Sequence, residues 1–185
     1  MSVNEVARRL GQCFDDDGIP YAIGGALALG VWGAPRQTQD VDVSVFVSPD
    51  ELPRVFDVLE RAGVMLDRAD ATRRVARTAF FQGRLGRTIV DVFLSEHPQY
   101  ESMRRRSQRV LDSTGQSLSF ISAEDLCLHK LIFGRPKDVV DVERLLAVRP
   151  ELDLGYVRSW LVQMVPAGDQ RIAVLDELAA RFSAG

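Results

Sequence analysis

Two aspartates, Asp40 and Asp42, interrupt a run of valines in the segment QDVDVSVFV. The valines occupy every second position from 41 to 47, a period of two that is typical of a β-strand with one buried face. Because side chains at i and i+2 of a strand point to the same face, the two carboxylates are expected to project together. Carboxylates spaced about 7 Å apart repel each other unless water screens them or a divalent cation lies between them. The segment therefore predicts either a solvated edge strand or a metal site.

A third carboxylate, Asp91, stands alone in the apolar segment TIVDVFL. A single aspartate in a strand of this kind needs a partner or a metal, because an unpaired buried charge is costly. If this strand lies beside residues 39–47, the three carboxylates converge on one face. Such a set could hold two Mg²⁺ ions, or Mn²⁺ in their place, since these cations prefer oxygen ligands. Asp91 could also accept the proton of an attacking hydroxyl.

A double glycine, Gly24-Gly25, precedes this strand and joins the short apolar segment IPYAI to the small-residue segment ALALGVWG. The pattern predicts a strand, a tight turn and a helix. Glycines at such a junction let backbone amides approach an anion at the helix N-terminus. Arg36 and Thr38, in the loop before the aspartates, are candidates to touch the same phosphate, although a loop arginine is more often simply solvated.

The rest of the chain predicts an α+β protein. Helical spacing covers residues 3–14 and 49–62, and a hairpin of two apolar strands is expected around GRLG. Residues 64–76 are expected to form an edge strand followed by a loop or short helix, and residues 98–108 a short helix before a polar strand or loop. From Ser122 onward the pattern is helical throughout. Ser122 is expected to cap a helix that ends at Gly134, and the next helix is expected to bury Val139. We expect a mixed-sheet core over residues 1–120 and a helical subdomain over residues 121–185, packed together as one unit.

These segments together resemble the DNA polymerase beta-type nucleotidyltransferase superfamily. The resemblance rests on Gly24-Gly25, fourteen intervening residues, Asp40-Val-Asp42 on an apolar strand, and Asp91 in a second strand. The segments RQTQDVDV and HKLIFGRPKDVVDVERLL are similar to a small bacterial branch of it, the AbiEii-type toxins. The resemblance covers residues 20 to 150 approximately. It implies a nucleotidyltransferase-type mixed β-sheet with flanking helices and a C-terminal helical part.

The activity that the resemblance implies is transfer of a nucleoside monophosphate from an NTP to an acceptor hydroxyl, with release of pyrophosphate. By position, Asp40 and Asp42 resemble the paired metal ligands. Asp91 resembles the third carboxylate, which serves as ligand and base.

The same resemblance assigns Lys130 to the nucleotide phosphates. Asp138 and Asp141, three residues apart on one helical face, would orient that lysine or the substrate. Other interpretations exist, since Asp138 could complement the helix dipole, and Lys137 with Asp141 could form an i,i+4 surface pair.

The distribution of arginines along the sequence is relevant to which molecule accepts the nucleoside monophosphate. Arginine accounts for 21 of the 23 basic residues, and residues 61–109 contain eleven arginines against five acids. A basic stretch of this kind could meet RNA, such as a tRNA end, or be a solvated face of arginines paired with neighbouring acids. A small hydroxyl compound or a protein side chain is an equally open acceptor, and a polycationic aminoglycoside would favour an acidic pocket.

Other functional classes remain as alternatives. A catalytically silent binding module or an antitoxin partner would be expected to have lost a carboxylate, and all three are present. A phosphotransferase is disfavoured because the glycine-rich segment GGALALG lacks the P-loop arrangement. The resemblance to AbiEii-type toxins also implies a role as the toxin of a toxin–antitoxin pair. With no apolar run near 20 residues and no signal-peptide pattern in MSVNEVARRL, we expect a cytoplasmic protein.

Overall fold

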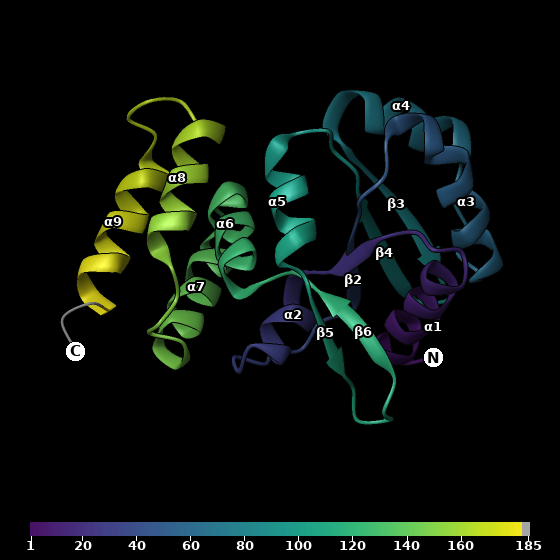
Figure 1. Cartoon of the computed structure of the whole chain (residues 1–185), viewed down its shortest axis with the longest axis horizontal. Helices are drawn as coiled ribbons and strands as arrows, with labels where there is room; N and C mark the ends of the chain where they lie inside the picture. The colour runs from purple at the N-terminus through teal and green to yellow at the C-terminus, as the bar shows by residue number, and fades with distance from the viewer. Residues whose placement is uncertain (183–185) are drawn as a thin grey trace. The chain divides into compact units, whose positions relative to one another are not determined.

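The computed structural model describes residues 1–182, and the chain divides into two compact units. The first unit comprises residues 1–27 and 37–121, and the second comprises residues 28–36 and those from 122 onward. Figure 1 follows the elements of both units along the chain. Residues 28–36 lie far from the C-terminal helices in sequence, yet they group with them, which the sequence pattern does not indicate.

A mixed β-sheet forms the centre of the first unit. Its strand order is β3-β4-β2-β1-β6-β5. Pairing is parallel for β2 with β4 and for β1 with β6, and antiparallel for the other neighbours. The strands are β1 (Tyr21–Ile23), β2 (Asp40–Val45), β3 (Phe80–Leu85), β4 (Thr88–Phe93), β5 (Gln108–Leu111) and β6 (Ser117–Phe120).

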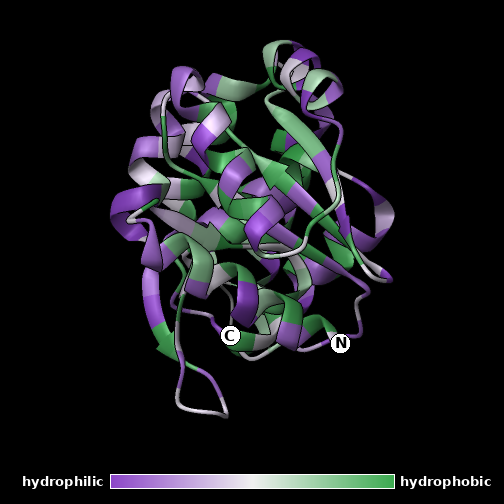
Figure 2. Ribbon diagram, turned by 90° about the vertical axis from the view of Figure 1, so that its right-hand side faces the viewer, coloured by the Kyte–Doolittle hydropathy of each residue, from purple (hydrophilic) through white to green (hydrophobic). Residues whose placement is uncertain are grey.

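Buried and partly exposed side chains alternate along β2 and β4, so one face of the sheet packs against the hydrophobic core. Val41, Val43 and Val45 on β2 are at most 1% exposed, as the period of two predicts. Val90 and Val92 on β4 are fully buried on the same side. In Figure 2 the strands are coloured largely as hydrophobic, with hydrophilic residues among them.

Helices cover the sheet of the first unit. Helix α1 begins with a capping box formed by Ser2 and Glu5, and its buried Phe14 stacks on Tyr21 of β1 with ring centroids 5.2 Å apart. Helix α3 follows a short 3-10 turn that starts at Pro49, as the Ser48–Pro49 pattern predicts. The helices are α1 (Val3–Asp16), α3 (Leu52–Arg61), α4 (Arg68–Thr78) and α5 (Pro98–Arg106), and α2 (Gly25–Val31) begins in this unit.

In two segments the structure selects among the alternatives that the sequence left open. The edge strand expected at the start of residues 64–76 is reduced to one pairing, Met65 with Arg84, and the loop or short helix expected after it is an eleven-residue helix, α4. The helix forms because Asp67 caps it by accepting a hydrogen bond from the backbone of Asp70 at 2.9 Å. The segment expected to be a polar strand or loop before residue 120 is the hairpin of β5 and β6.

The second unit is helical. Helix α6 is capped by Ser122 and ends at Gly134, whose φ is +61°, both as predicted from the sequence. Residues on all sides of α6 are buried, and the helix packs against α7 and α8. The helices from residue 122 onward are α6 (Ala123–Phe133), α7 (Pro136–Val148), α8 (Leu154–Met164) and α9 (Gln170–Phe182). Within residues 1–182, no helix combines the length and apolar character needed to cross a membrane.

Candidate active site

The three predicted carboxylates share one face of the sheet. Strands β2 and β4 run parallel, and Asp42 pairs directly with Asp91, while Asp40 pairs with Ile89. Residues at the same register on neighbouring strands point the same way, so Asp40, Asp42 and Asp91 lie together opposite the buried valines. All three are partly exposed. The convergence expected from the sequence is therefore present in the strand register.

The double glycine packs directly against this face. Gly24 donates its backbone N–H to the carbonyl of Asp42 at 2.9 Å. Gly25 has a φ of +55°, and a Cβ there would lie 1.7 Å from Asp42 Oδ2. A side chain at Gly25 would occupy the space of the Asp42 carboxylate. Glycine is thus required at residue 25 for the aspartate to hold its position.

Thr38 holds the start of strand β2. Its hydroxyl oxygen accepts a hydrogen bond from the backbone N–H of Asp40 at 3.2 Å. That contact fixes where the strand begins and therefore the register in which Asp40 is presented. Its predicted contact with a nucleotide phosphate stays a prediction.

Strand β3 adds two residues to this face that the sequence analysis missed. Gln82 pairs with Asp91 and Arg84 pairs with Ile89 across the antiparallel β3–β4 ladder. The amide of Gln82 donates to Asp91 Oδ1 at 2.8 Å. Both residues were hidden in a segment interpreted as an apolar strand, although its exposed positions alternate strictly with buried ones. That alternation is the signal that could have identified them.

The end of this face carries a small acidic cavity. Ser44 follows Asp42 on the same face of β2, and its side chain forms a hydrogen bond with Tyr100 of α5. Burial raises the pKa of Tyr100. Beyond it lies a cavity of about 280 Å³. It is lined by Phe46, Val47, Ser48, Glu51, Ser95, Glu96, His97, Pro98, Tyr100 and Glu101. The cavity thus continues the face that carries the aspartates past the carboxyl end of β2.

A second group of charges lies in the helical unit. Lys130 is 5% exposed, and its ammonium nitrogen donates to Asp138 at 3.0 Å and to Asp141 at 2.8 Å. The guanidinium Nε of Arg36 reaches both oxygens of Asp141 at 3.1 Å, and Arg135 bonds Asp138 at 2.5 Å. We call these five residues the Lys130 cluster. Both aspartates are buried, so helix α7 turns them inward rather than toward solvent.

Hydrogen bonds within the Lys130 cluster favour the ionised form of Asp138. Burial alone would raise the pKa of Asp138, but the hydrogen bonds from Arg135 and Lys130 outweigh it and hold that pKa below its usual value. Lys130, Asp138 and Arg36 were predicted to bind nucleotide. The structure brings them together, and their contact with a nucleotide stays a prediction.

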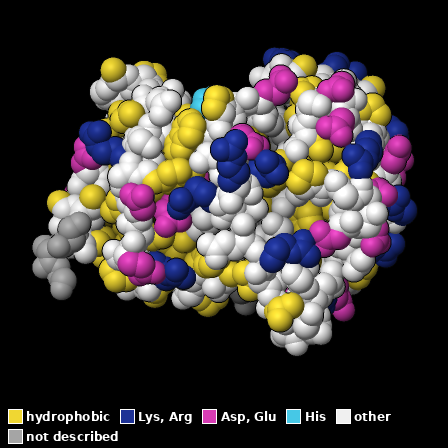
Figure 3. Space-filling view, in the orientation of Figure 1, with side chains coloured by type: hydrophobic (Ala, Val, Ile, Leu, Met, Phe, Trp, Pro, Cys, Tyr) yellow, Lys and Arg dark blue, Asp and Glu magenta, His cyan; other side chains and the backbone are white. Residues whose placement is uncertain are grey.

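The arginines of residues 61–109 are largely paired with acids. Arg68 bonds both Asp57 and Glu60, and Arg104 and Arg105 both bond Glu101. Figure 3 shows basic and acidic side chains next to each other over much of the visible surface. For Arg68, Arg104 and Arg105 the structure therefore favours the second interpretation, a solvated face of arginines paired with acids, rather than one continuous basic surface.

Comparisons with known proteins give similarity in structure alone. No family model matches the sequence, and no curated protein matches it. The antibiotic-resistance factor ANT(2'')-Ia superposes with a TM-score of 0.60 at 15% identity, covering 98% of this chain and 100% of its own. The chain has the nucleotidyltransferase fold. The same relative in complex with adenylyl-2''-tobramycin gives a TM-score of 0.58 at 15% identity, covering 98% of each chain.

Two further structures share the nucleotidyltransferase fold. TM1012, a candidate nucleotidyltransferase of Thermotoga maritima, has a TM-score of 0.52 at 13% identity, over 80% of this chain and 96% of its own. The lincosamide antibiotic adenylyltransferase LnuA, with lincomycin bound, has a TM-score of 0.50 at 13% identity, over 74% and 92%. These similarities confirm the predicted fold class. They do not test the AbiEii-like branch.

The donor set on the sheet suits a hard cation. Asp40, Asp42 and Asp91 offer only carboxylate oxygens, the ligands that Mg²⁺ prefers. Within residues 1–182, however, no three Asp, Glu, His or Cys side chains are gathered closely enough to hold a metal as they stand. The metal site on these aspartates stays a prediction, and the chemistry of the donors fits it.

Proposed function

We propose that the protein is a nucleotidyltransferase that moves a nucleoside monophosphate from an NTP to an acceptor hydroxyl. The observation that carries the proposal is the direct pairing of Asp42 with Asp91, with Asp40 on the same face, within a nucleotidyltransferase fold. Two neighbouring partly exposed carboxylates raise the free energy of the sheet through their mutual repulsion. A bound divalent cation would remove that cost.

The proposed reaction conserves atoms and charge in one displacement. The acceptor oxygen forms a bond to the α-phosphorus of the NTP, the bond from that phosphorus to the bridging oxygen breaks, and pyrophosphate leaves. Asp91 accepts the proton of the hydroxyl, and the Gln82 amide holds Asp91 Oδ1 in a fixed orientation. Asp40, Asp42 and Asp91 would hold one or two Mg²⁺ ions, or Mn²⁺, which supply charge neutralisation at the phosphate oxygens.

Nucleotide contacts are proposed for six residues. In the sheet unit, Gly24 and Gly25 give the backbone a close approach to phosphate, and Thr38 lies directly before Asp40. In the helical unit, Arg36 and Lys130 supply positive charge.

The sixth residue, Asp138, orients Lys130 through the 3.0 Å bond between them. This orienting role needs the pair to stay intact when nucleotide binds.

For the acceptor we propose a small hydroxyl compound that carries positive charge. Two structural relatives are named for antibiotics, one in complex with adenylyl-2''-tobramycin and the other an adenylyltransferase for lincosamides. The small cavity beyond Ser44 contains Glu51, Glu96 and Glu101, which favour a cationic ligand. Glu51 and Glu101 also pair with arginines, so an incoming amine would compete with those guanidinium groups.

RNA, including a tRNA end, and protein side chains are the other proposed acceptor classes. An AbiEii-like toxin role and an antitoxin partner stay predictions from the sequence resemblance. Each acceptor class gives a distinct labelled product, so one experiment separates them.

The test is label transfer from each α-³²P NTP, with Mg²⁺, into aminoglycosides and other hydroxyl-bearing small molecules, total RNA and protein. We expect transfer by the wild type and none by Asp42→Asn. Asp50→Asn, which changes an exposed acid in a 3-10 turn, is the matched control and should keep full activity. Absence of transfer into every fraction, or undiminished transfer by Asp42→Asn, would contradict the proposal.

A further inference from the structure

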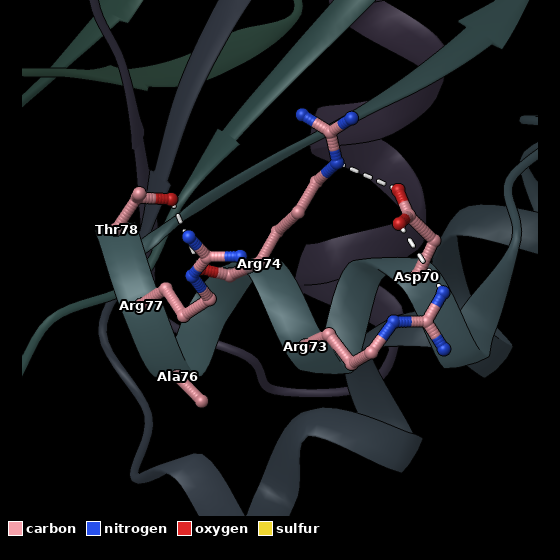
Figure 4. Close-up of a pocket in the computed structure, with 6 residues that line it drawn as sticks. All are labelled: Asp70, Arg73, Arg74, Ala76, Arg77 and Thr78. Carbon is pink, nitrogen blue, oxygen red and sulfur yellow. Dashed lines mark hydrogen bonds and ion pairs between the residues drawn. The ribbon is translucent and has the colours of Figure 1, made fainter.

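Helix α4 carries a cavity that the proposed reaction does not use. Its volume is about 590 Å³, within the range of small-ligand sites in proteins. Figure 4 shows the residues of α4 that line it. They are Asp70, Arg73, Arg74, Ala76, Arg77 and Thr78. None of them belongs to the strands that carry the three aspartates.

The lining of this cavity is strongly basic. The lining contains three arginines, Arg73, Arg74 and Arg77, and one carboxylate, Asp70. Asp70 accepts from Arg74 Nε at 2.6 Å and from Arg73 at 3.3 Å, and Figure 4 shows the two arginines reaching it from opposite sides. The hydrogen bond from Arg74, followed by that from Arg73, lowers the pKa of Asp70, so the carboxylate is ionised at neutral pH. Two positive charges remain in excess.

Arg77 supplies a guanidinium that is available to a ligand. Within residues 1–182 it has no hydrogen-bond or ion-pair partner. The neighbouring Thr78 hydroxyl does not bond Arg77. It donates to the backbone carbonyl of Arg74 at 2.9 Å, within the last turn of the helix. A cation in the last turn also complements the helix dipole. That effect accounts for Arg77 alone and leaves the cavity and the other two arginines unexplained.

The residue types define the ligand. A guanidinium presents five N–H donors in a planar fork that matches the oxygens of a phosphate group. Arg73 and Arg77 are four residues apart, so they lie side by side on the helix, and Asp70 fixes Arg74 and Arg73 by hydrogen bonds.

We propose that the α4 cavity is a binding site for a phosphate-bearing ligand, separate from the carboxylate site. The phosphate comes either from a small molecule, such as a nucleotide or pyrophosphate, or from the backbone of a nucleic acid. Binding at this site requires neither the aspartates nor a divalent cation, so it is independent of the proposed nucleotidyl transfer.

The test compares two double variants of the full chain that lose the same charge. Arg73→Gln/Arg77→Gln changes the cavity. Arg104→Gln/Arg105→Gln removes two exposed arginines that share one acid, Glu101, and is the matched control. Binding is measured in EDTA with two probes, pyrophosphate by calorimetry and a fluorescein-labelled twelve-nucleotide RNA by anisotropy.

We expect at least one probe to bind the wild type and to lose about tenfold or more in affinity in the cavity variant, with less than about a twofold loss in the control. If RNA is the ligand, the slope of log K against log salt falls by about 1.4, the value for two phosphate contacts on a single strand. Loss for pyrophosphate alone identifies a small-molecule ligand.

Asp42→Asn serves as the second control and should bind either probe as the wild type does, whether or not the protein transfers nucleotides. The proposal is overturned if neither probe binds, if both double variants weaken binding equally, or if Asp42→Asn alone weakens it.

Discussion

The aspartates of the sheet and those of the Lys130 cluster have opposite surroundings. On the sheet, Asp42 and Asp91 pair side by side and are partly exposed, and the partner of Asp91 on strand β3 is a neutral amide. In the cluster, Asp138 and Asp141 are buried, and each bonds a lysine and an arginine. Acids paired in this way stabilise the fold, whereas adjacent acids on an accessible face suit an incoming cation. On this comparison the charges of the Lys130 cluster stabilise the fold in addition to their proposed nucleotide contact, whereas the acids of the sheet are proposed to bind a metal.

The largest effect is expected at Asp42. Asp42→Asn should lower kcat/KM for nucleotidyl transfer by about 10⁴-fold, or roughly 5.5 kcal/mol of transition-state stabilisation. Its free energy of unfolding should be unchanged or slightly higher, because one of two repelling carboxylates becomes neutral. Steady-state kinetics and urea denaturation of the same preparation measure both quantities. A variant that loses stability along with activity would place Asp42 among the structural charges.

At Lys130 a loss of stability is expected in addition to the loss of its proposed nucleotide contact. Lys130→Met should reduce the free energy of unfolding by about 3–5 kcal/mol, because two buried carboxylates lose a shared cation. The chain has one other lysine, Lys137, which is exposed. Lys137→Met is the matched control and should change stability by less than about 0.5 kcal/mol. Equal stability of both variants by urea denaturation would show that the cluster does not hold the helices together.

The two glycines test how tightly the sheet positions its acids. Gly25→Ala should cost about 1–2 kcal/mol for the left-handed backbone, and it should also inactivate the protein because the new Cβ displaces the Asp42 carboxylate. A Cβ at Gly24 would approach Ile121 at 3.4 Å, an ordinary contact. Gly24→Ala should therefore leave the Asp42 carboxylate in place and lose much less activity than Gly25→Ala, through the phosphate approach alone. Similar losses in both variants, measured by the transfer assay, would argue against the close packing at Gly25.

A smaller effect is expected from pH at Asp138. Its pKa is lower in the folded protein than in the unfolded chain, so its stabilising contribution is complete above the unfolded pKa of about 3.9. That contribution is lost as the pH falls through the lower, folded pKa. Denaturation from pH 6 to pH 2 should show a weaker acid dependence in Asp138→Asn than in the wild type. An Asp50→Asn control should follow the wild type, and parallel curves for all three would contradict the account.

The sequence predicts the sheet site better than the helical cluster because a strand has a simple period. Alternation alone places Asp40 and Asp42 together, and the apolar neighbours of Asp91 indicate a central strand. The same alternation also marks Gln82, but its strand contains two phenylalanines, so the segment was interpreted as apolar. Helix caps such as Ser122 and Gly134 could be predicted from the sequence because their hydrogen bonds lie within one turn of the helix.

The remaining features depend on packing between distant segments. The bond between Lys130 and Asp141 needs α6 and α7 to cross at particular residues, and no local pattern encodes that crossing. Val139 was expected to be buried in α7 but is only partly so, since Asp138 and Asp141 occupy the inward positions. The grouping of residues 28–36 with the C-terminal helices is equally nonlocal.

Direct measurement of metal binding tests the central claim without knowledge of the acceptor. Mn²⁺ would be titrated against the wild type, Asp42→Asn and Asp50→Asn, with free Mn²⁺ followed by electron paramagnetic resonance. If the three aspartates form the catalytic metal site, the wild type and Asp50→Asn bind Mn²⁺ alike, and Asp42→Asn binds at least about tenfold more weakly. Equal binding by all three proteins, or binding by none, would contradict a metal-dependent active site on strands β2 and β4.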